Sequence, residues 1–208
     1  MYFAVIIAAL TAYLLGNLNG AVCMSTLLAK EDVRSHGSGN AGLTNFIRNY
    51  GAGSSLFVIL IDAGKAVIAC FASGLMLASF GHYEEGLALG GLCVVLGHCF
   101  PALLGFRGGK GILSGWFVAW VLDWRIGLLI FVVFAAAYLL TQYVSLGSVL
   151  AGLAFAASFA WLHHDNPIVM MIGIAAGLLT VFMHRGNIAR LLKGEERKTN
   201  LFGKGNQK

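Results

Sequence analysis

Long apolar segments separated by short polar breaks dominate this chain of 208 residues. The pattern predicts seven helical segments, at Tyr2–Ala29, Ser54–Phe80, Leu87–Leu104, Ile112–Leu122, Ile126–Leu140, Ser148–Leu162 and Pro167–Met183. Because a perpendicular helix needs about 20 apolar residues to cross a bilayer, the shorter segments must extend into uncharged neighbours. We therefore predict an all-α, polytopic membrane helix bundle of about seven transmembrane helices, built as a single domain over residues 1–208.

The polar break Asp123-Trp124-Arg125 leaves open whether residues 112–140 form two short helices or one long tilted helix. With seven spans, one set of loops and the tail carry Lys30, Arg34, Arg48, Arg107, Lys110, Arg185, Arg190, Lys193, Arg197, Lys198, Lys204 and Lys208. The other set of loops carries only Arg125. The positive-inside rule then predicts an outside N-terminus and a cytoplasmic C-terminus, whereas one long helix would export the basic tail.

Composition agrees with a membrane protein, since 58% of the residues are hydrophobic, 11% are charged and the mean hydropathy is +0.80. A soluble domain carries about 25% charged residues. The net charge of +5 comes from cations spread over several loops, without a nucleic-acid-binding signature. Trp124 and Trp161, near predicted outer ends, suit interface anchors. We therefore expect the lipid bilayer as a partner and no nucleic acid.

The sequence offers little support for a metal or a cofactor. Cys23, Cys70, Cys93 and Cys99 all fall in apolar segments without a C-x-x-C pair, which is typical of small core residues. The run His163-His164-Asp165 falls in a predicted external turn, where a solvated loop is the simpler interpretation. We predict no metal site and no bound cofactor.

Three glycine-rich polar islands interrupt the apolar pattern. They are GSGNAGLTNFIR at residues 37–48, GFRGGKG at residues 105–111 and HRGNIARLLKGEE at residues 184–196. Each combines glycine with cations and with Ser, Thr or Asn, so backbone amides and charged donors can converge on one anion. If the three islands meet at one membrane face, the chain handles a phosphorylated substrate there.

The first island formally matches the dinucleotide fingerprint G-x-G-x-x-G at Gly37, Gly39 and Gly42, with Asp62 twenty residues further on. No β-strand precedes it and Asp62 lies in a membrane span, so the fingerprint has the wrong context. The island still offers anion donors in the hydroxyls of Ser38 and Thr44, the amides of Asn40 and Asn45 and the guanidinium of Arg48. The alternative is a flexible cytoplasmic loop with a helix cap.

In the second island Lys110 stands among Gly108, Gly109 and Gly111, which resembles a P-loop, but residue 104 is Leu104 where the Walker spacing needs glycine. A lysine among glycine amides at the start of a helix can nevertheless hold phosphate. A positive-inside anchor is the alternative.

The third island places His184 and Asn187 three residues apart, hence on one face of a continuing helix. A basic juxtamembrane helix has a similar pattern. Asp62 and Lys65, also three residues apart within a span, should point into the bundle. A structural ion pair and a catalytic role both remain open for this pair, as packing and catalysis do for His98.

The order GSGN-x-G-x-TN-x-x-R, D-x-x-K, GH-x-FP, GGKG and H-x-x-NI-x-RL-x-x-G-x-E-x-K extends from Gly37 to Lys198. It resembles the bacterial acyl-phosphate:glycerol-3-phosphate acyltransferase family, whose members have seven helices and an outside N-terminus. The chain departs from the family pattern at Ala41, Leu43, Ala66 and Arg107. None of these departures removes a polar donor.

The resemblance implies transfer of a fatty acyl group from acyl phosphate to the sn-1 hydroxyl of glycerol 3-phosphate, giving lysophosphatidic acid and phosphate. It implies a site made by catalytic Ser38, Lys110, His184 and Asn187 and by substrate-binding Gly37, Gly39, Asn40, Thr44, Asn45, Arg48, Gly108, Gly109, Gly111, Ser145 and Ser148. The expected partners are these two substrates and the bilayer, with the protein a monomer. The resemblance also implies a location in the inner membrane of a bacterial cell, with the active site on the cytoplasmic face.

A covalent acyl-enzyme is not expected, since the chain has no G-x-S-x-G and its cysteines are embedded in apolar segments. The hydroxyl's proton could pass to His184 or, as the family implies, to the substrate's own phosphate. The competing class is an organophosphate transporter, or an anion channel, which would also use glycine-broken helices and intramembrane charges. A transporter would place its site near midplane between repeated halves, and no repeat occurs in the sequence.

Overall fold

The computed structural model describes residues 1–199, so Lys204 and Lys208 of the predicted cytoplasmic cations lie outside the described residues. Its helices are α1 (Tyr2–Gly16), α2 (Gly20–Ala29), α3 (Leu43–Tyr50), α4 (Ser55–Ala78), α5 (Tyr83–Cys99), α6 (Ile112–Leu122), α7 (Trp124–Thr141), α8 (Val144–Leu162), α9 (Pro167–Met183) and α10 (Arg185–Leu192), with short 3-10 turns η1 (Val33–Ser35) and η2 (Ala102–Leu104). No strand occurs in this range. The all-α prediction is confirmed.

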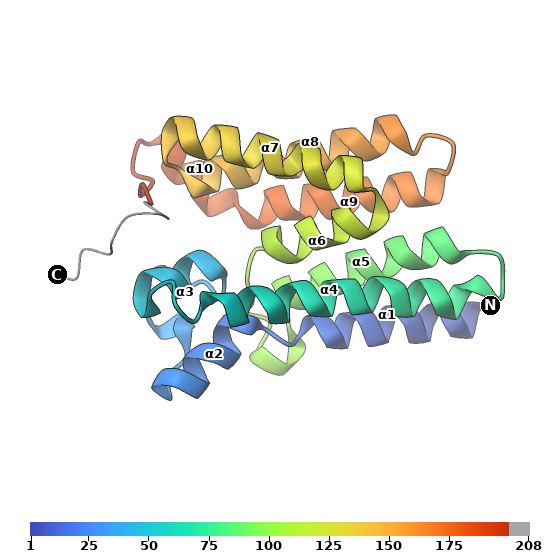
Figure 1. The fold of residues 1–208 in the computed structure, drawn as a ribbon, viewed down its shortest axis with the longest axis horizontal. Helices are drawn as coiled ribbons and strands as arrows, with labels where there is room; N and C mark the ends of the chain where they lie inside the picture. The colour runs from blue at the N-terminus through green and yellow to red at the C-terminus, as the bar shows by residue number, and fades with distance from the viewer. Residues whose placement is uncertain (200–208) are drawn as a thin grey trace.

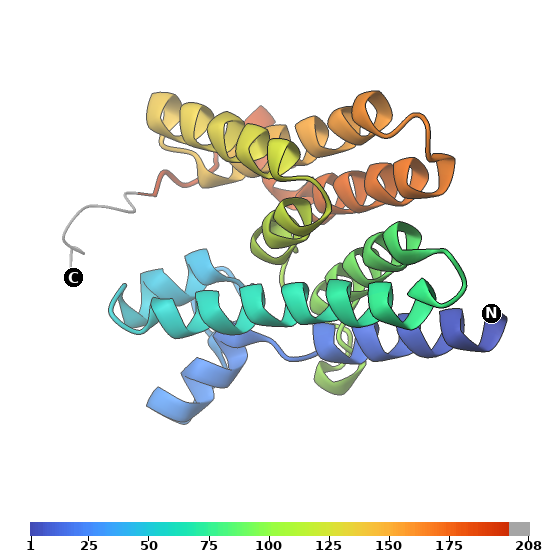
Figure 2. The ribbon, with the colours of Figure 1, turned by 45° about the vertical axis from the view of Figure 1, so that its right-hand side comes forward.

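The long helices form two groups with α6 between them (Figure 1). In one group α5 packs against both α1 and α4, and in the other α8 packs against both α7 and α9. α6 contacts α4, α5, α7 and α9, and Figure 2 shows it joining the two groups. The close approach of α1 and α5 depends on glycine, because a Cβ on Gly97 would lie 2.9 Å from the Cα of Gly16.

Apolar side chains cover the outside of the bundle, as expected for a protein surrounded by lipid. Within residues 1–199, five segments are long and apolar enough to cross a membrane, at Tyr2–Ala29, Ser55–Ala78, Tyr83–Leu104, Trp124–Thr141 and Val144–Leu162. α9 and α10 together make a sixth candidate bent by 53°, while α6 is shorter, with 11 residues. Residues 112–140 form two helices, which resolves the alternative left open by the sequence.

The first predicted segment is interrupted, which the apolar pattern did not indicate. α1 ends at Gly16 and α2 begins at Gly20 after an extended Asn19, whose side chain accepts a hydrogen bond of 3.0 Å from the backbone N–H of Val22. Asparagine is a favoured N-cap because its side chain satisfies such an unpaired amide. The two asparagines at the break, Asn17 and Asn19, are both buried.

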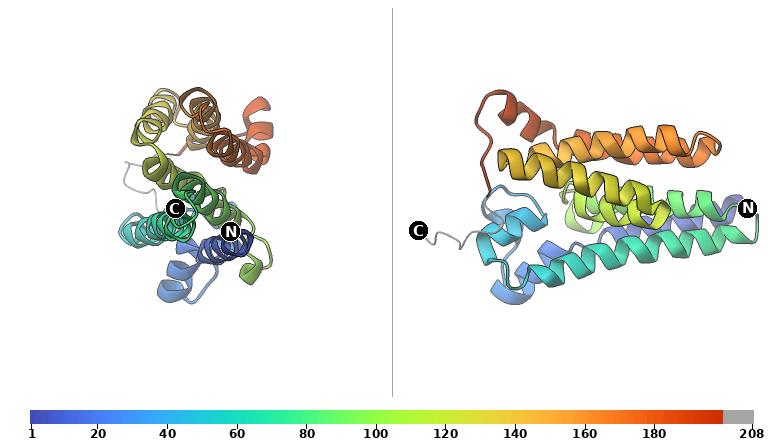
Figure 3. Two further views of the ribbon diagram at one scale, coloured as in Figure 1. Left: turned by 90° about the vertical axis from the view of Figure 1, so that its right-hand side faces the viewer. Right: turned by 45° about the horizontal axis from the view of Figure 1, so that its top comes forward.

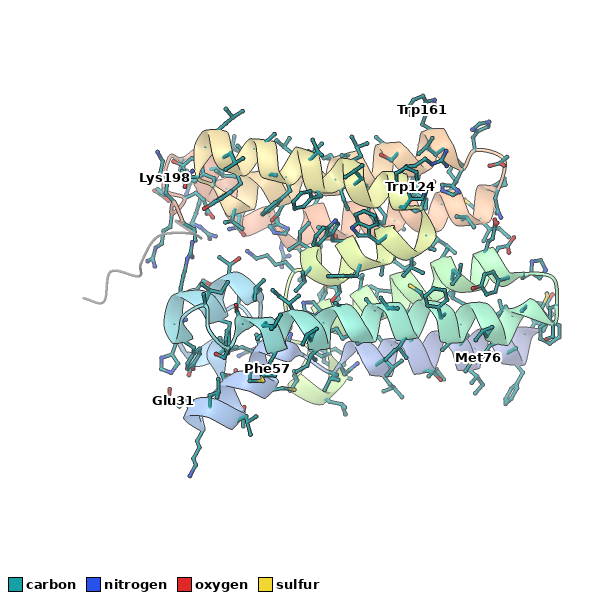
Figure 4. The ribbon with its side chains drawn as sticks, viewed as in Figure 1. Glu31, Phe57, Met76, Trp124, Trp161 and Lys198 are labelled. Carbon is teal, nitrogen blue, oxygen red and sulfur yellow. The ribbon has the colours of Figure 1, made fainter. Side chains whose placement is uncertain are left out.

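The two ends of the bundle differ in chemistry. The N-terminus lies at the end opposite α3, α10 and the last described residues (Figure 3). Figure 4 places the exposed rings of Trp124 and Trp161 toward the same end as the N-terminus, far from Lys198. All three glycine-rich islands thus belong to the half of the molecule that carries α3 and α10, which gives them the opportunity to form one site.

Candidate active site

A cavity of about 830 Å³ opens between the two helix groups and is lined by all three islands. The predicted site residues that line it are Gly37, Ser38, Gly39, Asn40, Thr44, Asn45, Arg48, Lys110, Gly111, Ser145, Ser148, His184 and Asn187. Gly108 and Gly109 are absent from the lining. The structure therefore brings together segments that lie far apart in the sequence, and the chemical roles of their side chains stay predictions.

The first island folds as a loop followed by a helix, because α3 begins at Leu43. Its buried Asn45 is occupied in holding the loop: Nδ2 donates to the carbonyls of Val33 (3.0 Å) and His36 (3.1 Å), and Oδ1 accepts from the backbone N–H of Ser38 (2.9 Å). Asn45 therefore positions Ser38, whose side chain is exposed at the cavity. One turn further along α3, the guanidinium of Arg48 donates to the hydroxyl of Thr199.

The two glycines that do not reach the cavity pack against the end of α5. The backbone N–H of Gly108 donates to the carbonyl of Cys99 (3.2 Å), and that of Gly109 donates to the carbonyl of His98 (3.1 Å). A Cβ on Gly109 would lie 3.0 Å from His98 Cε1 and from the carbonyl oxygen of Ala41. Both amides already have acceptors, so these glycines permit a close approach of backbone instead of offering donors to an anion.

Lys110 follows these glycines, and its ammonium group donates to Oδ1 of Asn187 across the cavity. Burial lowers the pKa of Lys110 from its ordinary value to about 8. Most Lys110 side chains are therefore charged at pH 7, with an amide oxygen as partner instead of a carboxylate. A cation held this way has charge available for an anionic ligand.

His184 stands between α9 and α10, beyond the last residue of α9. Its Nδ1 lies 2.8 Å from the carbonyl oxygen of Thr180, which can only accept, so Nδ1 carries a proton and the Nε2 lone pair is available. Burial lowers the pKa of His184 to about 4. The imidazole is therefore neutral at pH 7 and a weak proton acceptor.

Glu196 joins the third island to α8 through its hydrogen bonds. It is not among the site residues that the sequence predicts. Its Oε1 accepts from Ser145 Oγ (2.8 Å) and Asn187 Nδ2 (2.7 Å), and its Oε2 accepts from Arg190 Nε (2.7 Å). Burial acts to raise its pKa, but these hydrogen bonds outweigh it and hold the pKa of Glu196 below its ordinary value. We refer to Lys110, Asn187, Glu196, Ser145 and Arg190 as the Glu196 network.

The chain after α10 runs across the cavity and lines it with Glu196, Arg197 and Thr199. The backbone N–H of Thr199 donates to the carbonyl of Gln142 (3.0 Å), and its carbonyl accepts from the hydroxyl of Tyr138 (3.0 Å). With Arg48 on its hydroxyl, Thr199 ties α3 to α7. In the sequence, the glutamate in the pattern that begins at His184 is the one sign that the chain after α10 reaches the site.

One wall of the cavity is apolar and comes from α6, α7 and α8. It includes Ile112, Leu113, Trp116, Ile130, Phe131, Phe134 and Ala151. The rings of Trp116 and Phe131 stack with centroids 5.3 Å apart. Cations and polar donors at one end and hydrocarbon along the other suit an amphipathic ligand with an anionic head.

None of the four cysteines lines the cavity, and all are free thiols. Within residues 1–199, no three His, Cys, Asp or Glu side chains are grouped as metal ligands. Asp62 and Lys65 form an ion pair of 2.8 Å, and Asp62 and His98 lie at the inner boundary of the cavity. The structural ion pair, which the sequence left open as one alternative for Asp62 and Lys65, is therefore present in the structure.

Comparison with known proteins gives one consistent result. A family model described as Glycerol-3-phosphate acyltransferase matches residues 6–194. Proteins of that name from Finegoldia magna and Anaeromyxobacter dehalogenans are 36% and 39% identical, over 95% and 94% of this chain and 97% and 96% of their own lengths.

Two crystal structures of PlsY (YgiH), an integral membrane glycerol 3-phosphate acyltransferase, resemble this fold at 32% identity. Its glycerol 3-phosphate form gives a TM-score of 0.83, covering 96% of this chain and 99% of that one. Its lysophosphatidic acid form gives 0.80, covering 95% and 96%.

Proposed function

Because the chain belongs to the glycerol-3-phosphate acyltransferase family, we propose that it transfers a fatty acyl group from acyl phosphate to the sn-1 hydroxyl of glycerol 3-phosphate. The chain is an integral membrane acyltransferase. The observation that carries the proposal is the cavity whose cationic end meets an apolar wall. Such a cavity matches two phosphates at one end and one acyl chain along the other.

The reaction is a direct transfer. The sn-1 oxygen of glycerol 3-phosphate attacks the carbonyl carbon of acyl phosphate, the bond from that carbon to the phosphate oxygen breaks, and inorganic phosphate leaves. The absence of cysteine from the cavity lining supports a route without an acyl-enzyme. His184, whose Nδ1 faces the Thr180 carbonyl, has no hydrogen bond to a serine among residues 1–199, so the described part of the chain has no Ser–His pair of the kind that activates a serine nucleophile.

Lys110 and Arg48 bind the phosphates in this mechanism. Each holds a neutral side chain in the structure, Asn187 and Thr199 respectively, and a phosphate oxygen forms a stronger, charge-assisted hydrogen bond. Positive charge placed where negative charge develops lowers the barrier, and holding both substrates in one cavity supplies the orientation. Ser38, Asn40 and Thr44 complete the polar end.

We assign the proton of the attacking hydroxyl to a phosphate oxygen of the substrates. The pKa of His184, about 4, makes the imidazole a poor base at pH 7. Its unprotonated Nε2 instead accepts a hydrogen bond and so orients the hydroxyl. His184 is thus proposed to position the acceptor.

We place the protein in the bacterial inner membrane as a monomer of one domain, with the cavity facing the cytoplasm and α6 counted as a seventh span. The basic islands and the opposite location of the N-terminus, Trp124 and Trp161 support this orientation. This orientation can be tested with single-cysteine variants of a protein in which all four native cysteines have been replaced. A cysteine at Ser38 should react with an impermeant thiol reagent only from the cytoplasmic side, and one at Glu84 only from outside; the reverse pattern would contradict the topology.

The activity test is purified protein in detergent supplied with glycerol 3-phosphate and acyl phosphate. We expect release of phosphate in equal amount to the lysophosphatidic acid formed, with acyl-coenzyme A inactive as donor. Equal turnover with acyl-coenzyme A would contradict the proposed donor. Uptake of glycerol 3-phosphate into sealed vesicles without turnover would indicate a transporter instead.

A further inference from the structure

A cluster of three ionisable side chains lies buried between α4 and α5, and the proposed chemistry does not use it. Asp62, Lys65 and His98 are 1%, 3% and 4% exposed. The Lys65 ammonium lies 2.8 Å from Asp62 Oδ1 and 2.8 Å from His98 Nδ1. Buried charges persist only where partners compensate for lost water, so the further contacts of this Lys65 triad indicate what it holds.

The triad's first set of contacts reaches the break between α1 and α2. Lys65 Nζ donates to the carbonyls of Leu18 (2.6 Å) and Gly16 (3.3 Å), and Asp62 Oδ1 accepts from the backbone N–H of Gly20 (3.1 Å). A helix break inside a bundle leaves backbone groups without intrahelical partners. The ion pair supplies them and so fixes the angle between α1 and α2.

The break in turn holds the loops that carry the first two islands. Asn19 Nδ2 donates to the carbonyl of Ala41 (2.9 Å), inside the first island. Asn17 Oδ1 accepts from the backbone N–H of Leu103 (3.0 Å), just before the second island. One short stretch of backbone, pinned by Lys65, therefore sets where both loops lie.

The triad's second set of contacts brackets Lys110. On one side the carbonyl of His98 accepts from Gly109 N–H (3.1 Å), and the His98 ring packs so closely on Gly109 that a Cβ there would lie 3.0 Å from Cε1. On the other side Ser114 Oγ donates to the carbonyl of Asp62 (3.2 Å). The backbone on both sides of Lys110 thus rests on triad residues.

We propose that Asp62, Lys65 and His98 are positioning residues, which set the first island and Lys110 in register across the cavity by pinning the α1–α2 break and the Gly108–Ser114 segment. For its kinetic consequence the inference rests on the proposed acyl transfer. A displacement of about 1 Å at a site that works by orientation can cost roughly 100-fold in rate. The triad therefore affects catalysis without contact to the reacting atoms.

The test must separate positioning from mutual neutralisation of two buried charges. Lys65→Met alone removes the ammonium partner of the buried Asp62 carboxylate, leaves only His98 Nδ1 at 3.6 Å as a cation-forming neighbour, and should lower the thermal midpoint in detergent. In the double variant Asp62→Asn/Lys65→Met both charges are gone and the substituted amide oxygen still accepts from Gly20 N–H, but the contacts of Lys65 to Gly16, Leu18 and His98 are lost. Asp123→Asn, at the other end of α6, is the matched control for losing a buried carboxylate.

We expect the double variant to recover the wild-type thermal midpoint while kcat/KM for glycerol 3-phosphate stays at least about 10-fold low. Trypsin should cleave it faster after the exposed Arg107, with cleavage after Lys193 unchanged. Wild-type kcat/KM and wild-type cleavage at Arg107 in the folded double variant would overturn the inference. The cleavage needs no turnover, so a wild-type protein inactive with acyl phosphate would refute the proposed function and leave this readout decisive.

A second pair of variants serves if the double variant does not fold. His98→Asn keeps a side-chain amide near the position of Nδ1 that can accept from Lys65, whereas His98→Ala removes it. We expect His98→Asn to keep most of the kcat/KM and the slow cleavage after Arg107. His98→Ala should lower kcat/KM about 10-fold and speed the cleavage after Arg107 about 10-fold. Equal behaviour of the two variants would contradict a positioning role for the ring.

Discussion

The Lys65 triad and the Glu196 network differ in what their side chains hold. Lys65 donates to two backbone carbonyls, and Asp62 accepts from a backbone amide. In the Glu196 network the partners are side chains on separate elements, from Lys110 through Asn187 to Glu196. Backbone groups cannot turn away without moving the chain, whereas a side chain changes partner by rotating about its own bonds. The first arrangement suits a fixed framework, and the second suits exchange with a ligand.

The largest expected effect in this comparison comes from Lys110→Ala, which removes the exchangeable cation. Loss of a charge-assisted contact of this kind costs about 2 to 4 kcal/mol of transition-state stabilisation, roughly 30- to 1,000-fold in kcat/KM. The thermal midpoint should stay close to that of wild type, because Lys110 supports no backbone. Steady-state kinetics and thermal unfolding measure both, with Lys193→Ala, outside the cavity lining, as control. Normal turnover by Lys110→Ala would remove the distinction between the two networks.

His184→Ala sharpens the assignment of chemistry within the exchangeable half of the comparison. A general base typically contributes about 100- to 10,000-fold. A histidine that only orients the hydroxyl should cost about 10-fold, and the pH profile should keep its shape. A larger loss together with disappearance of an acidic limb near pH 4, where the wild-type imidazole takes up its proton, would make His184 the base.

The pH dependence of kcat/KM tests whether Lys110 acts through its charge. Its pKa of about 8 means that the free enzyme loses this positive charge as the pH rises through 8. We expect kcat/KM to fall about twofold by pH 8 and about tenfold by pH 9. Lys110→Arg, which stays protonated, should lack this alkaline limb even if its rate at pH 7 is lower. The same limb in Lys110→Arg would assign it to another group.

The smallest effect is expected from changing Cys23, Cys70, Cys93 and Cys99 together to Ala. None of these thiols lines the cavity, so kcat should remain within about threefold of wild type, while the loss of buried volume lowers the thermal midpoint. Phosphate release by the folded variant measures this. A folded but inactive variant would point to a covalent route and against direct transfer.

The convergence of the three islands could be predicted because hydropathy and charge alone set which loops share a membrane face. The same logic separates residues 112–122 from residues 126–140, as the structure shows. These inferences depend on properties summed over many residues. They are therefore insensitive to the local path of the backbone.

The sequence could not show which donors are already occupied. Gly108 and Gly109 have the composition of an anion-binding loop, but their amides donate to carbonyls at the end of α5. Asn45 has the side chain of a ligand-binding residue, but Val33, His36 and Ser38 already take its hydrogen bonds. Each outcome depends on tertiary contacts that residue type and spacing do not encode.

Glu196 and the break at Asn17 and Asn19 show the same limit in another form. Glu196 enters the site only because the chain after α10 turns back across the cavity. The break lies within a run of apolar residues, where two asparagines are too few to change the average hydropathy. Their importance becomes visible once the partners Ala41 and Leu103 are known.

The shortness of α6 has a consequence for how the enzyme meets its substrates. Its 11 residues extend only about 16 Å at 1.5 Å per residue, roughly half of the 30 Å hydrocarbon layer, and it begins inward of α3 and α10 (Figure 1). The end of the cavity at Lys110 is therefore recessed, within reach of one leaflet as well as of water. Under the proposed reaction, the concentration of the lipid donor is then measured per unit of membrane area and that of glycerol 3-phosphate per unit of volume. We therefore expect inert lipid mixed into the vesicles to slow turnover by surface dilution, and dilution of the whole suspension at constant glycerol 3-phosphate to leave the rate per enzyme unchanged.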